Sequence, residues 1–142
     1  MRFAKNLFNQ VWTYLEQADR TADDDAAMIH AAHASRHHWS KVGGPEQAAR
    51  GEWQCSRVYA TVGRAEAAMY HARRCLDVCQ RHGIGAFDLA FAHEAIARAH
   101  AIAGNATDAA QHLGLARTAA AGIADDDDRE LVLADLASIE PG

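Results

Sequence analysis

Histidines gather in one short segment of the chain, MIHAAHASRHHW, and could bind a metal ion there. His30, His33 and His37 are spaced three and four residues apart, so on a helix they would share one face. His33 and His37 form an H-x-x-x-H pair, a spacing that can chelate zinc or another first-row transition metal. The pair lacks the glutamate of the hydrolase motif H-E-x-x-H, because Ala34 follows His33. A metal site is therefore the alternative to a polar helix face with hydrogen-bonded imidazoles.

A second set of residues could bind a ligand without reacting with it. Arg50, Trp53 and Arg57 lie at i, i+3 and i+7, and a helix would place them on one face. An indole offers flat apolar area, and guanidinium groups grip carboxylate or phosphate groups. The alternative is that Trp53 belongs to the core, since Trp is mostly buried in any fold. The arginines would then pair with Glu52 or Glu94.

The cysteines show no catalytic pattern. Cys75 and Cys79 lie one helical turn apart, which separates their Cβ atoms by about 5–6 Å, whereas a disulfide needs about 3.5–4.5 Å. We expect these two and Cys55 to be reduced thiols that pack as small hydrophobes, as is usual in a cytoplasm. The chain contains no G-x-G-x-x-G, Walker, G-x-S-x-G or C-x-x-C motif. These observations favour a binding protein without a cofactor over an enzyme.

The elements that must position these residues are predicted from glycine spacing and apolar periodicity. Glycines recur about every twenty residues, and between them apolar residues recur at three and four positions. Glycine commonly ends helices, because it enters the left-handed conformation without strain. We expect the Asp23–Asp25 run and Asp125–Asp128 to cap and charge the helices that follow them. The predicted helices are 3–18, 24–41, 45–62, 65–82, 87–103, 106–121 and 127–139.

The chain also repeats itself after 41 residues. This shift superimposes RVYATVGRAEAAMYHA on RAHAIAGNATDAAQHL, so that Gly63 falls on Gly104 and Ala68 on Ala109. Both segments read as a helix, a glycine turn and a second helix that carries a small residue five positions after the glycine. We expect Ala68 and Ala109 to be sites where the two arms of a helical hairpin pack closely.

The first copy resembles a tetratricopeptide repeat. Tyr59, Gly63 and Ala68 hold the offsets of that family's aromatic, glycine and small residue, while the second copy has His100 in place of the aromatic. The spacing of 41 exceeds the common one of about 34, so these repeats would be long-armed. The resemblance covers residues 45–121, with 1–42 as an extra hairpin and 127–139 as a capping helix. It implies an all-α domain, 1–142, of about seven helices in antiparallel hairpins, stacked as a short right-handed superhelix.

The resemblance also implies where a partner would bind. In such arrays the first helix of each hairpin lines the concave surface, which would bring Arg50, Trp53 and Arg57 there with Trp53 partly exposed. The predicted site also includes Glu94 and Arg98, which hold the matching offsets one repeat later, and Trp12 as a neighbour on the first helix. We predict that this face binds a peptide, a protein partner or a small anionic ligand.

Composition narrows the class of partner. The net charge is −5, so the chain lacks the basic footprint of a nucleic-acid-binding protein. The first twenty residues contain no unbroken apolar stretch, so we expect neither a signal peptide nor a membrane span, and a cytoplasmic location. Short arrays often leave an apolar end uncovered, which would allow a homodimer. The predicted surface for it is the first helix, with Phe3, Leu7, Phe8, Val11 and Leu15.

Overall fold

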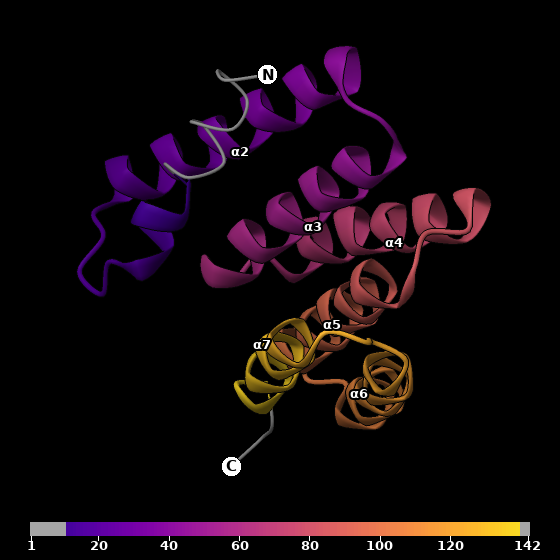
Figure 1. Ribbon diagram of the computed structural model, residues 1–142. Coiled ribbons are helices and arrows are strands. Elements are labelled where there is room, and N and C mark those ends of the chain that lie inside the picture. Colours follow the sequence, from indigo (N-terminus) through magenta and orange to yellow (C-terminus); the bar gives the residue numbers. More distant parts are fainter. Residues whose placement is uncertain (1–10, 140–142) are drawn as a thin grey trace.

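The protein is an array of helical hairpins. The computed structural model describes residues 11–139, and this part of the chain is all-helical, without a strand (Figure 1). Residues 11–16 are helical, and the following helices are α2 (Ala22–Val42), α3 (Pro45–Thr61), α4 (Ala65–His82), α5 (Ala86–Ala103), α6 (Ala106–Ala121) and α7 (Asp126–Ala137). The predicted boundaries agree within two residues from α2 to α7. Residues 1–10, with the predicted dimer residues Phe3, Leu7 and Phe8, lie outside the described residues.

Local signals account for most helix ends. Gly83 has φ of +60°, a conformation that favours glycine, and its N–H bonds to the carbonyl of Cys79 at the end of α4. Asp125 caps α7 by accepting the N–H of Asp128, as expected. One expectation was wrong, because the cap of α2 is Thr21 rather than an aspartate. Thr21 forms a reciprocal capping box with Asp24, and the acids fill the first turn.

The 41-residue repeat is visible in the packing. Ala68 and Ala109 are both buried, as their predicted role in close packing requires. The turn after α3 is closed by a bond from Arg64 N–H to the Tyr59 carbonyl, and the turn after α5 by the equivalent bond from Asn105 to His100. Equivalent rings also stack across each hairpin, namely Tyr59 on His71 and His100 on His112. The two hairpins are therefore built alike.

The helices pack in chain order, and α3 also contacts α5 (Figure 1). The last helix, α7, folds back on α5 and α6, where Val132 and Leu136 join their hydrophobic core. The cysteines are unpaired and buried, as predicted. Within residues 11–139, no helix combines the length and the apolar composition needed to cross a membrane.

Candidate functional site

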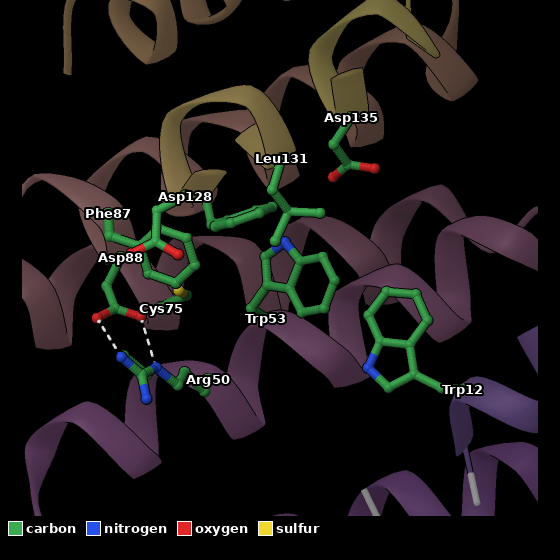
Figure 2. Close-up of a pocket in the computed structure, with 11 residues that line it drawn as sticks. Trp12, Arg50, Trp53, Cys75, Phe87, Asp88, Asp128, Leu131 and Asp135 are labelled. Atoms are coloured by element: carbon green, nitrogen blue, oxygen red, sulfur yellow. Dashed lines mark hydrogen bonds and ion pairs between the residues drawn. The ribbon is translucent and has the colours of Figure 1, made fainter. Parts of the chain in front are cut away.

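A pocket of about 700 Å³ lies between α3, α5 and α7 and contains half of the residues predicted for the binding face. Figure 2 shows Trp53 in its wall, the Arg50–Asp88 pair on one side, and Trp12 on the other. Three side chains of α7 face this space from the opposite helix. The complete lining is Trp12, Ala49, Arg50, Trp53, Cys75, Phe87, Asp88, Phe91, Asp128, Leu131 and Asp135.

Four aromatic rings form a continuous wall. The ring centroids of Trp12 and Trp53 are 5.6 Å apart, and those of Trp53 and Phe91 are 5.3 Å apart at a steep angle. Phe87, one helical turn before Phe91, continues the row at 5.1 Å. These separations fall in the range in which aromatic pairs attract one another beyond the burial of their area. The wall is therefore held by its own contacts.

Trp53 corrects one expectation. Its side chain is buried, with 8% exposure, although a binding role had predicted partial exposure. The ring is packed between Trp12 and Phe91, and its indole N–H donates to the Glu94 carboxyl at 2.8 Å. The alternative, that Trp53 belongs to the core, agrees with this burial. Trp53 still forms part of the pocket wall.

Behind this wall lies a buried carboxyl group. Glu94 is fully buried, and it accepts from Arg98 Nε at 3.1 Å as well as from Trp53. The pKa of Glu94 is raised to about 8, first by burial and then by the neighbouring Asp135 carboxyl, against the opposing effect of Arg98 and Arg57. The raised pKa favours the protonated form of Glu94 near neutral pH, in which its O–H can donate a hydrogen bond to Asp135.

Arg57 and Arg98, predicted to grip an external carboxylate, hold a carboxylate of α7 instead. Arg57 Nη1 donates to both oxygens of Asp135, at 2.9 and 3.1 Å. Arg98 Nη2 lies 3.5 Å from the same carboxylate and donates to Ser138 Oγ at 2.8 Å. The anion-binding position at this end of the face is thus already filled from within the chain.

Arg50 is paired in the same way. Its guanidinium donates to both oxygens of Asp88, at 2.9 and 3.2 Å, and lies 5.9 Å from the centroid of Phe87. The hydrogen bond to Asp88 raises the pKa of Arg50, and the charge of Asp128 adds to this effect. Sequence reasoning did not single out Asp88, Asp128 or Asp135 as members of this site.

The predicted histidine site is not assembled as expected. His33 Nε2 lies 2.8 Å from the Tyr59 hydroxyl, while His30 and His37 are exposed. His71 does approach His33, with ring centroids 5.3 Å apart, but its Nδ1 is bound to Glu52 at 3.0 Å. Burial, and then the neighbouring His71, lowers the pKa of His33. Among residues 11–139, no three His, Cys, Asp or Glu side chains are arranged to hold a metal ion.

His93 contacts a histidine of the second hairpin, His112. Its Nδ1 is 3.2 Å from Nδ1 of His112, and the His100 ring stacks on the other side of His112. Burial lowers the pKa of His93 and of His112, with a neighbouring histidine adding to the effect in each case. Histidine rings therefore meet in two places: His33 of α2 meets His71, and His93 and His100 meet His112.

No protein-family model, curated protein or solved structure matches the chain. The hairpin array is seen directly in the structure, whereas the tetratricopeptide type and the handedness of its superhelix stay predictions. The role of the pocket rests on its own side chains.

Proposed function

We propose that the chain is a binding module without catalytic activity, and that the pocket between α3, α5 and α7 receives an apolar or aromatic group of a peptide or protein partner. The observation that carries the proposal is the cavity of about 700 Å³ walled by four aromatic rings. Ligand sites are typically concave, about 300–1,000 Å³ in volume, and lined by apolar and aromatic side chains with a few polar groups.

One side chain at the rim supports an external occupant. Leu131 lines the pocket from α7 and keeps 57% of its surface exposed. A ligand that covered it would gain the free energy of removing that apolar surface from water, about 25 cal/mol per Å². Trp12, which is half-buried, offers further apolar area on the opposite side.

A small anionic ligand has less support. The guanidinium groups of Arg50 and Arg57 are each bound to an aspartate, and Arg98 is bound to Glu94. An incoming carboxylate would have to break one of these pairs and leave the displaced acid without its partner, which is costly where groups are buried.

Nucleophilic catalysis has equally little support in this pocket. Cys75 is the thiol in its lining, and a hydrogen bond with Cys79 together with burial raises its pKa well above the ordinary value. The thiol therefore stays protonated at neutral pH, whereas the thiolate is the reactive form.

The proposal is tested with two leucines of one helix. Peptides selected from a random displayed library are titrated against the full chain carrying Trp39→Phe, so that fluorescence reports on Trp12 and Trp53. Leu131→Ala should weaken binding about five- to tenfold, the effect of losing about 1–1.4 kcal/mol of apolar contact. Leu133→Ala is the matched control, because Leu133 is 42% exposed on α7 but does not line the pocket. Equal sensitivity to both changes, or failure to select any peptide, would refute the proposal.

A further inference from the structure

The charges that line the pocket are predominantly negative. Its lining contains the single cation Arg50 and the three acids Asp88, Asp128 and Asp135. Two guanidinium nitrogens of Arg50, Nε and Nη2, donate to Asp88, and Asp135 is held by Arg57. Asp128 is different, because no hydrogen bond from any residue of 11–139 reaches its carboxylate. The pocket therefore presents one carboxylate without a hydrogen-bond donor from these residues, whereas the charge of its guanidinium is paired with Asp88.

The start of α7 strengthens this negative charge. Asp125 caps the helix, and three further aspartates, Asp126 to Asp128, fill the first turn. The helix dipole places only about +0.5 of a charge at this end, which four carboxylates outweigh. Arg129 pairs with Asp126, which leaves a net negative charge beside the pocket mouth.

The aromatic walls accept positive charge as well. The guanidinium of Arg50 lies 5.9 Å from the Phe87 ring centroid, and that of Arg57 lies at the same distance from Trp53. A cation within about 6 Å of a ring centroid is attracted by the ring's quadrupole. No cation of the described residues lies over Trp12 or Phe91 in this way, and both rings line the pocket.

We propose that the group received by this pocket is an organic cation, an ammonium or guanidinium on an apolar body, whose charge faces Asp128 while its hydrocarbon part packs on Trp12, Phe91 and Leu131. The inference rests on the proposed function and deepens it, since it specifies the charge of the ligand. The arginines alone predicted an anionic ligand, whereas this inference predicts a cationic one. The same chemistry is offered by a basic side chain of a peptide and by a free amine.

Three matched probes separate the inference from the proposed function. They are 2-phenylethylamine, which is a cation at pH 7, the neutral 2-phenylethanol and the anion 3-phenylpropionate, each titrated into the full chain and followed by the indole N–H signals in NMR spectra. We expect the amine to bind about tenfold more tightly than the alcohol, with the anion weakest, because a carboxylate contact and a cation–π contact both favour it. The preference should shrink in high salt.

The assignment to Asp128 is tested by substitution. Asp128→Asn should weaken binding of the amine about fivefold and leave binding of the alcohol unchanged. Asp127→Asn is the control, because Asp127 lies in the same exposed turn but does not line the pocket. Equal binding of amine and alcohol, equal effects of the two substitutions, or tightest binding of the anion would each overturn the inference and leave the proposed function standing. If none of the three probes binds, both the inference and the proposed function are refuted.

A last comparison distinguishes the two sources of the cation. The blocked dipeptide amide acetyl-Lys-Phe-amide is compared with its norleucine counterpart, which lacks only the charge. If the lysine charge increases affinity at least as much as the charge of 2-phenylethylamine does over 2-phenylethanol, the site is assigned to a peptide. A smaller increase assigns it to a small molecule and contradicts the peptide partner of the proposed function. Absence of any gain in both pairs contradicts the inference.

Discussion

The substitution Glu94→Gln tests whether the centre of the structure contains a neutral carboxyl group. Glu94 is fully buried, and its pKa is raised from 4.5 to about 8, chiefly by burial. Glutamine keeps the shape of the side chain and an oxygen that accepts from Trp53, but its NH2 replaces the oxygen that accepts from Arg98 Nε. The loss of that bond should lower stability by a similar amount at each pH, so it does not alter the pH dependence that is tested. The change therefore replaces an ionisable group by a permanently neutral one with little alteration of packing.

The magnitude follows from proton linkage. Between pH 4.5 and 8 the folded protein binds the Glu94 proton while the unfolded chain releases it, so this group makes the free energy of unfolding fall as pH rises. Each unit of pKa difference corresponds to about 1.4 kcal/mol. Between pH 5 and pH 7 the wild type should lose about 2–3 kcal/mol through Glu94, and the glutamine variant should not.

The assay is urea unfolding followed by circular dichroism at pH 5, 6, 7 and 8, for the wild type and the variant. Other titrating groups contribute almost equally to both proteins, so the difference in free energy of unfolding isolates Glu94. Glu130→Gln, an exposed change on α7, is the control and should give a constant difference. A constant difference for Glu94→Gln as well would refute the raised pKa. A variant that becomes relatively less stable as pH rises would mean that Glu94 is ionised and paired with Arg57 and Arg98.

Three further predictions concern packing, protonation and metal. Ala68→Leu should overpack the first hairpin and cost about 1–3 kcal/mol, whereas Ala110→Leu on the exposed face of α6 should leave the urea midpoint nearly unchanged; equal midpoints would contradict the assigned contact. The lowered pKa values of His93 and His112 mean that the unfolded chain binds more protons, so their contribution to stability should be lost as pH falls below about 6.5. His112→Gln should reduce this acid sensitivity in the same urea assay, and an unchanged pH profile would contradict it. If the histidines of α2 bind zinc, His33→Ala should abolish saturable uptake in a zinc titration, and weak uptake unchanged in the variant would remove the metal hypothesis.

The helices could be predicted because their signals are local. Apolar periodicity and glycines such as Gly63 and Gly104 act over a few residues, and the observed boundaries follow them closely. The 41-residue shift likewise placed Ala68 and Ala109 correctly inside their hairpins. The same shift superimposes Glu52 on His93 and His71 on His112. This correspondence could have indicated that Glu52 contacts His71 and that His93 contacts His112.

The polar part of the candidate site could not be predicted in the same way. The Arg57–Asp135 pair joins residues 78 positions apart, and it exists only because α7 folds back over the first helices of the hairpins. Helical spacing indicates which residues share a face, but it does not indicate what lies opposite that face. The arginines were therefore recognised as carboxylate-binding and Glu94 was named as one alternative partner, but Asp88 and Asp135 were not.

The position of α7 explains why the pocket has a different charge from the face on which it is built. Without α7, Arg57 and Arg98 would lose Asp135 and keep only their contacts with Glu94 among these acids, so more of their positive charge would face an incoming ligand. Asp135 neutralises much of that charge, and Leu131 closes one side of the face into a pocket. In our proposal the carboxylate of Asp128, which accepts no hydrogen bond from residues 11–139, then determines the sign of the charge that the pocket prefers in a ligand. A capping helix in such an array can thus set the ligand class as well as complete the core.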